Sequence, residues 1–291
     1  SENAVITVDS GSVKIHEDAA VLLKADDGKI TPGLISGVSI YSESIKNAYN
    51  EGKDAVSFGV SGISVLDSDI KIGGSTGYFS VKKNAQGVPV ATKSKKGKGY
   101  NSVIVLDNKG DAFSRSSAEL SSGVGIFTGG DKSVGKLLEL ENVYLWVDGW
   151  KRATVTSNYS PTAKNAGPGL TGPYVVFKDS YIECPGSENY KYGWMALYGG
   201  ARNTLIQGNH AWYYNSTLKS EGWGNLAIDG GPTINIYAVN CDVGNYGGGY
   251  TIYSPGDGWA ELFGVKATSA QYGMFLTGNA SGKIGSLNDA G

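Results

Sequence analysis

A short phrase recurs through the second half of the chain and constrains the fold more than any other feature. Two to four apolar residues are followed by one polar residue and then by glycine, at 124–130, 194–200, 225–231, 250–256 and 272–278. The last four copies return at intervals of roughly 20 to 30 residues, which is typical of one solenoid coil. The gap between the first two copies leaves room for a further coil.

A second strand-like run follows most copies of the phrase. These runs are found at 137–147, 204–214, 234–243 and 260–270, and a similar run without a clear phrase ahead of it lies at 174–184. Aligning the runs places Asn142, Asp179, Asn209 and Asn240 in one column, with Lys266 in the last coil. Asn and Asp tolerate left-handed backbone conformations and can hydrogen-bond when they stack. We therefore expect a polar ladder at a turn of the solenoid.

This pattern resembles that of the right-handed parallel β-helix, the architecture of the pectate-lyase-like superfamily. The resemblance covers roughly residues 35–291 and rests on the repeat alone, since no catalytic motif of a named family is matched. It implies an all-β solenoid over residues 36–291 with long loops on one edge. Residues 1–35 are then expected to form an N-terminal cap or a first irregular coil, because solenoid ends need covering.

Composition narrows the classes of partner. The net charge of −2 argues against nucleic acid, and no apolar run approaches the roughly 20 residues of a membrane span. The sequence begins with Ser1 instead of methionine, which we interpret as the result of signal-peptide removal. We therefore expect a secreted or cell-surface protein.

The two cysteines are predicted to be free. Cys184 and Cys241 fall in second runs two coils apart. Neighbouring strands are about 4.8 Å apart, so two coils separate these residues by roughly 9–10 Å, beyond the reach of a disulfide. We expect two largely buried thiols.

One long segment, 81–100, carries six lysines together with glycine and proline. This composition predicts an exposed flap or hairpin. A solvated loop is favoured over an anion-binding loop, because runs of charge are usually solvated.

The loops that join successive coils suggest a ligand cleft, because they are rich in aromatic residues. Equivalent loops of a solenoid stack along one edge, and amphipathic rings there can stack on sugars or on other rings. The alternative is that these rings pack on one another and stiffen glycine-rich loops. The predicted substrate-binding residues are Trp150, Arg152, Tyr192, Trp194, Tyr213, Trp223, Asn225 and Tyr250.

A polar column in the recurrent phrase adds candidate catalytic groups to this cleft. The aligned positions are Thr128, Tyr198, Asp229, Ser254 and Thr277, and Asp229 is the only carboxylate among them. We expect Asp229 to act as a general acid or base, with Tyr198 or Tyr214 as its partner and Lys219 stabilising negative charge. The alternative is a solvent-facing Asp229 that begins a Gly-Gly turn.

Two functions follow from these residues. The first is a secreted enzyme, a lyase, isomerase or hydrolase, that performs acid/base chemistry on a carbohydrate or another ring-containing small molecule without a cofactor. The second is a noncatalytic adhesin-like or glycan-binding module. The chain has two histidines and two cysteines without metal-ligand spacing, and no dinucleotide fingerprint, so neither metal nor organic cofactor is expected. Residues 67–69, Asp-Ser-Asp, fit a turn or a Ca²⁺ site equally well.

Overall fold

The computed structural model describes the chain in separate stretches. These are residues 5–8, 19–24, 33–43, 61–66, 70–107, 124–129, 137–148, 152–156, 174–185, 197–199, 209–221, 228–229, 234–245, 250–254, 259–269, 272–276, 278 and 281–290. They are almost entirely β-strand. The one helical element among them is a short 3-10 helix, η1, at Leu287–Asp289.

Four parallel sheets contain nearly all of the strands. Sheet A comprises β1 (Val5–Val8), β4 (Ser39–Glu43), β9 (Ser102–Asp107), β12 (Val143–Asp148), β15 (Tyr181–Pro185), β18 (Thr217–Glu221), β21 (Asp242–Asn245) and β24 (Lys266–Ser269). Sheet B comprises β2 (Ala19–Lys24), β5 (Ser61–Leu66), β10 (Val124–Gly129), β13 (Arg152–Thr156) and β16 (Leu197–Gly199). Sheet C comprises β3 (Gly33–Ile35), β6 (Ile70–Gly73), β11 (Leu137–Glu141), β14 (Tyr174–Lys178), β17 (Asn209–Tyr214), β20 (Ile234–Val239), β23 (Trp259–Phe263) and β26 (Ser281–Gly285). Sheet D comprises β19 (Ile228–Asp229), β22 (Tyr250–Ser254) and β25 (Tyr272–Leu276).

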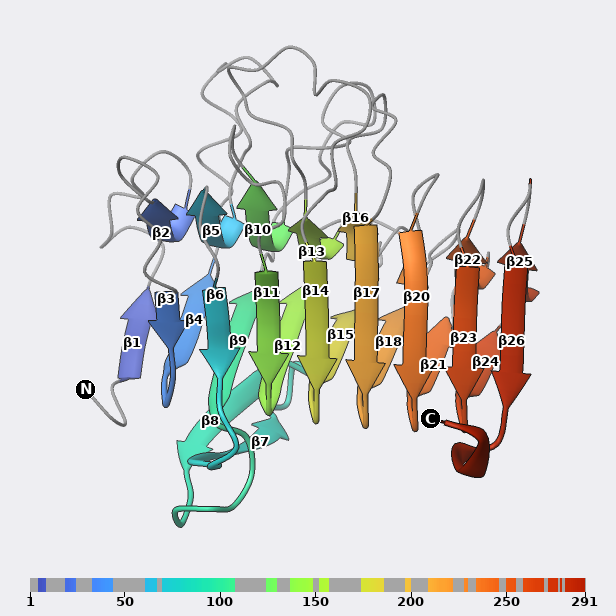
Figure 1. Ribbon diagram of the computed structural model, residues 1–291. Coiled ribbons are helices and arrows are strands. Elements are labelled where there is room, and N and C mark those ends of the chain that lie inside the picture. Colours follow the sequence, from blue (N-terminus) through green and yellow to red (C-terminus); the bar gives the residue numbers. More distant parts are fainter. Residues whose placement is uncertain are drawn as a thin grey trace.

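The strands follow one another through these sheets in a fixed order. The chain passes from sheet A to sheet B or D, then to sheet C, and returns to sheet A one strand further along (Figure 1). The recurrent phrase supplies strands of sheets B and D, and the gap between its first two copies holds a further round, β13, β14 and β15. The fold is therefore all-β with long parallel sheets, as expected, and is consistent with a β-solenoid.

The core lies between the sheets and follows from the alternation of side chains along each strand. In β11 the side chains of Leu138 and Leu140 are fully buried, whereas Glu139 and Glu141 lie on the outer face. The same alternation repeats in successive strands of sheet C, so their apolar residues stack from coil to coil. This main core includes Ile72, Leu138, Leu140, Phe177, Tyr213, Ile236, Ala238 and Leu262.

A polar ladder stands at the turn from sheet C to sheet A, as the sequence predicts. Asn142, Asp179, Asn215 and Asn240 have φ values of 55°, 51°, 48° and 53°, in the left-handed region. Asn142, Asp179 and Asn240 were predicted in this column. The amide hydrogen of each residue is donated to a carbonyl of the next strand in sheet C, as in Asn215 N to Val239 O at 3.0 Å.

Two members of the predicted ladder are wrong. Asn209 begins β17, and Asn215 six residues later ends it and takes the turn position. In the last coil the position belongs to Gly264, with a φ of 60°, whereas Lys266 pairs with Asp242 inside sheet A. Both errors arise because a second run need not be a single strand: 137–147, for example, contains β11 of sheet C, the left-handed turn at Asn142 and most of β12 of sheet A.

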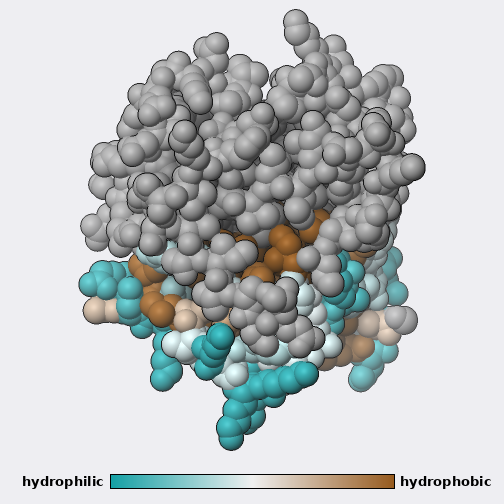
Figure 2. All heavy atoms as spheres, turned by 90° about the vertical axis from the view of Figure 1, so that its left-hand side faces the viewer, coloured by the Kyte–Doolittle hydropathy of each residue, from teal (hydrophilic) through white to brown (hydrophobic). Residues whose placement is uncertain are grey.

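The lysine-rich segment forms the predicted hairpin. Strands β7 (Phe79–Lys83) and β8 (Pro89–Lys93) pair antiparallel and project below the sheets in Figure 1, toward the lower margin that is hydrophilic in Figure 2. Phe79 and Val88 are buried against the outer face of sheet A. The backbone passes close at Gly99, where a Cβ atom would lie 2.0 Å from the carbonyl oxygen of Phe79. The hairpin is therefore a packed layer and not a free loop.

The two cysteine-bearing segments lie two strands apart in sheet A. Strand β15 contains Cys184, strand β18 follows, and Cys241 immediately precedes β21. Cys241 is a free, buried thiol. Within the described stretches no helix is long and apolar enough to cross a membrane. The boundary at residue 35 stays a prediction, since β1, β2 and β3 are simply the first strands of sheets A, B and C.

Candidate functional site

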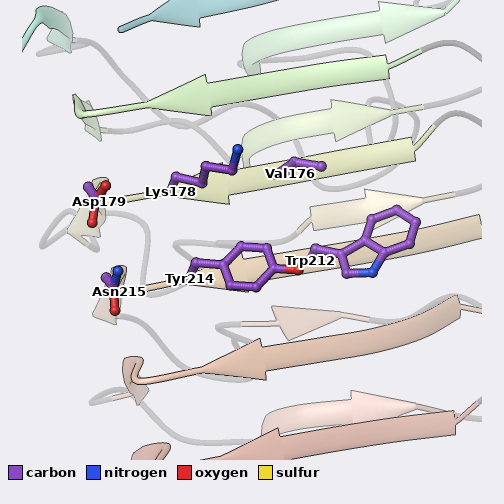
Figure 3. Close-up of a pocket in the computed structure, with 6 residues that line it drawn as sticks. All are labelled: Val176, Lys178, Asp179, Trp212, Tyr214 and Asn215. Atoms are coloured by element: carbon purple, nitrogen blue, oxygen red, sulfur yellow. The ribbon is translucent and has the colours of Figure 1, made fainter. Parts of the chain in front are cut away.

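The outer face of sheet C carries a groove of about 540 Å³ between β14 and β17 (Figure 3). Its lining residues come from these two strands and from the turns that end them. They are Val176, Lys178, Asp179, Trp212, Tyr214 and Asn215.

Strand alternation sets this lining. In β14 the side chains of Val176 and Lys178 point outward while Phe177 is buried, and in β17 Trp212 and Tyr214 point outward while Tyr213 is buried. Val176 is the register partner of Trp212. A small side chain beside a large indole leaves a depression, and Figure 3 shows Tyr214 directed along the strand toward Trp212. The groove therefore has an apolar floor and an aromatic wall.

Two turn residues close one end of the groove with polar groups. Asp179 and Asn215 are exposed, and their left-handed backbones end β14 and β17. Asn215 Oδ1 also accepts a hydrogen bond of 2.9 Å from Nδ2 of Asn240 on the next coil. This bond uses one acceptor site of an amide that has several donor and acceptor sites. The remaining sites can reach a ligand in the groove.

The aromatic wall continues along sheet C. The rings of Tyr214 and Tyr237 lie 6.0 Å apart at 55°, and those of Tyr237 and Phe263 lie 5.8 Å apart, also at 55°. Burial, and secondarily the neighbouring Tyr237, raise the pKa of Tyr214. The Tyr214 hydroxyl therefore stays protonated at neutral pH and can donate a hydrogen bond.

Charges at the side of the groove are paired. Lys178 Nζ lies 3.5 Å from Glu139 Oε1, and Lys71 Nζ lies 3.2 Å from the same oxygen and 2.5 Å from Glu141 Oε2. The hydrogen bond to Glu141 is the main cause of a raised pKa for Lys71. Two carboxylates thus face two ammonium groups, and this flank carries no net charge.

The structure does not bring together the predicted catalytic residues Tyr214 and Lys219. Tyr214 lies on the outer face of sheet C, and Lys219 lies on β18 in sheet A, where its Nζ is 5.5 Å from the centre of the Tyr181 ring. Placing both residues in a connecting loop was therefore wrong. Tyr213, also placed in that loop, has no exposed surface and packs in the core with its ring 5.5 Å from that of Phe177. It cannot contact a ligand at the loop edge.

The other two predicted catalytic residues fall on neighbouring strands, β16 for Tyr198 and β19 for Asp229. Their predicted column is shifted by one position. Asp229 pairs with Tyr253 and not with Ser254. A shift of one residue exchanges the two faces of a strand. Accordingly Ile252, the register partner of Ile228 beside Asp229, is buried in the core.

The remaining predicted binding residues are only partly placed. Arg152 and Tyr250 are the first residues of β13 and β22, so Arg152 does not belong to a loop. The others lie outside the described residues: Trp150, Tyr192, Trp194, Trp223 and Asn225. Among the described residues, no group of three or more His, Cys, Asp or Glu side chains could hold a metal ion. Residues 67–69 are also outside them.

Sequence reasoning missed the groove residues Val176, Lys178 and Trp212. Alternation does not mark them in the sequence, because 175–177 is a continuous apolar run and Trp212, Tyr213 and Tyr214 are three consecutive aromatic residues. Sequence reasoning also missed Glu183, a buried carboxylate of sheet A that is bound by Lys83 of the hairpin at 2.6 Å and by the Tyr181 hydroxyl at 3.1 Å. The contact between Lys83 and Glu183 joins residues 100 positions apart, so no local pattern reveals it.

Comparison with protein-family models, with curated proteins and with solved structures finds no match for this chain.

Proposed function

We propose that this protein is a secreted or cell-surface module that binds carbohydrate on the outer face of sheet C, without catalysis. Its fold in this proposal is a right-handed parallel β-helix of the pectate-lyase-like type. The observation that carries the proposal is the groove, in which Trp212 and Tyr214 flank the small Val176 and the polar Asp179 and Asn215 stand at one end.

This combination matches what sugar recognition requires. The flat faces of Trp212 and Tyr214 can cover the apolar C–H face of a pyranose ring. Hydrogen-bonding groups at the rim can fix the orientation of its hydroxyls, as the few polar groups of an apolar pocket do. The placement of Tyr214 and Lys219 on strands of different sheets also favours binding over catalysis, because an acid/base site needs its groups within hydrogen-bond reach.

The test is a binding screen of the full chain against immobilised neutral and acidic oligosaccharides, followed by calorimetry. Trp212→Ala should weaken binding of any ligand found by about tenfold, because loss of one aromatic stacking contact costs up to about 1.5 kcal/mol. Trp259→Ala, which removes an indole elsewhere in sheet C, is the matched control and should keep the affinity. A screen without any bound glycan, or equal losses in both variants, would contradict the proposal.

A second function is supported by the adjacency of β16 and β19. Tyr198 and Asp229 lie on these strands, which fits an acid/base pair. The activity would be that of a cofactor-independent lyase, isomerase or hydrolase. Asp229→Asn should then lower turnover of a carbohydrate substrate by roughly 10² or more. Unchanged turnover would exclude this role for Asp229.

A further inference from the structure

We infer that the groove is one position in a row of sugar subsites, and that its ligand is a neutral, extended oligosaccharide of about three pyranose rings lying across β14, β17 and β20. The inference rests on the glycan-binding function proposed above and adds to it the ligand's charge, length and direction.

The direction follows from the register of sheet C. Val176 pairs with Trp212, and Trp212 pairs with Tyr237, so these three outward positions lie side by side on successive strands. Successive strands are about 4.8 Å apart, close to the length of one pyranose residue in an extended chain. A sugar chain that crosses the strands therefore meets a new coil with each ring.

Each of these coils also presents one polar side chain at the same edge. Asp179, Asn215 and Asn240 end β14, β17 and β20 in the left-handed conformation, and all three are exposed. The hydrogen bond between Asn240 and Asn215 holds two of them in register. The row thus offers one hydrogen-bonding group on each coil and an apolar or aromatic surface made by Val176, Trp212 and Tyr237, which suits a ligand that itself repeats.

The row is bounded on both sides. On β11 the position next to Val176 is Glu139, which is engaged by Lys71 and Lys178. On β23 the position next to Tyr237 is Glu261. The ring of Phe263, two positions further along, is only 2% exposed, with Lys283 Nζ 5.0 Å from its centre. Neither neighbour offers an open aromatic face, so the row is limited to β14, β17 and β20, with its aromatic rings on β17 and β20.

The ligand is neutral because the row offers no unpaired cation. Lys178 is the one basic residue that lines the groove, and Glu139 lies 3.5 Å from it. Asp179 adds a negative charge at the exposed end. A carboxylated or sulfated sugar would meet this carboxylate without a compensating free ammonium group, which disfavours it.

The experiment is a chain-length series. Calorimetry of the full chain would use gluco-, manno- and xylo-oligosaccharides with β-1,4 linkages, from the monosaccharide to the pentasaccharide. In at least one series the affinity should rise by about an order of magnitude up to the trisaccharide and then level off. Tyr237→Ala should remove most of the gain between disaccharide and trisaccharide. Asn240→Gly, which preserves the left-handed turn, should reduce the same gain.

The outcomes separate this inference from the proposed function. A monosaccharide that binds as tightly as the trisaccharide, with Trp212→Ala still weakening it, would overturn the row and leave the groove as a single glycan site. Affinity that continues to rise beyond the tetrasaccharide, or falls equally in Phe263→Leu and Tyr237→Ala, would overturn the bounds of the row. Preference for polygalacturonate over every neutral series would overturn the neutral ligand. Absence of binding to all of them would overturn both proposals.

Discussion

The contact between Lys83 and Glu183 is expected to fasten the hairpin to sheet A. Glu183 is 2% exposed, and Lys83 Nζ lies 2.6 Å from its Oε1, while the Tyr181 hydroxyl donates to Oε2 at 3.1 Å. Lys83→Met removes the cation and keeps the length of the side chain. It leaves a buried carboxylate with a tyrosine donor but without its counter-charge.

The free-energy cost of Lys83→Met can be bounded from the geometry of this contact. Breaking a fully buried ion pair costs about 3–5 kcal/mol. The Lys83 side chain is 47% exposed, so water screens its charge. The appropriate figure is therefore that of one hydrogen bond to a charged group, about 1.5–3 kcal/mol. This corresponds to roughly a ten- to hundredfold change in the opening equilibrium of the hairpin.

Native-state hydrogen exchange measures that opening directly. The amides of Ser94 and Gly97, which donate to Tyr78 O and Gly77 O at 2.8 Å, should exchange about ten- to hundredfold faster in Lys83→Met. Lys82→Met is the matched control. The neighbouring Lys82 makes no ion pair with any described residue, so its removal should leave these rates unchanged. Equal rates in wild type and Lys83→Met would refute the reasoning.

Two further predictions concern the turns and the core. Asn215→Ala should lower the free energy of unfolding by about 1–2 kcal/mol, because alanine is strained in the left-handed region. Asn215→Gly should lower it less, because glycine adopts this conformation readily. Equal losses for the two variants in denaturant titrations would argue against strain. Burial raises the pKa of Cys241 to about 11. The thiol ionises more readily in the unfolded chain, so its contribution to stability is complete below about pH 8.5 and is lost as the pH rises toward 11. Ellman titration at pH 8 should find Cys241 unreactive until denaturant is added, and immediate reaction in the native protein would contradict its burial.

Much of the all-β fold could be predicted from the sequence because its strands repeat. The phrase at 250–256 and 272–278 recurs because each copy occupies the same place in successive coils, as β22 and β25 show. Asn142, Asp179 and Asn240 were recognisable for a related reason. Few residue types adopt the left-handed conformation of this turn, so a recurring Asn or Asp in the sequence indicates its position.

The candidate site was harder to predict because strand faces depend on register to a single residue. Aligning Asp229 with Ser254 instead of Tyr253 exchanged the inner and outer faces of sheet D. The second error was to treat each second run as one strand. Tyr214 and Lys219 are five positions apart, and the turn at Asn215 sends them to different sheets. The position of this turn could not be recognised from residue type, because Asn209 and Asn215 are both asparagines that could occupy it.

The same turn explains where a binding surface can arise in this fold. Because the chain changes direction at Asn215, residues close in sequence separate, while residues a whole coil apart become neighbours, as Tyr214 and Tyr237 do at 6.0 Å. A row of similar residues across coils therefore requires no additional loop. It requires only that one outward position of successive strands carries the same class of residue. Sheet C meets that condition over β17 and β20 and loses it at β23, where the register partner of Tyr237 is Glu261. The extent of the row is thus set by single outward positions, which is why exchanging Tyr237 alone is expected to shorten the ligand that the surface accommodates.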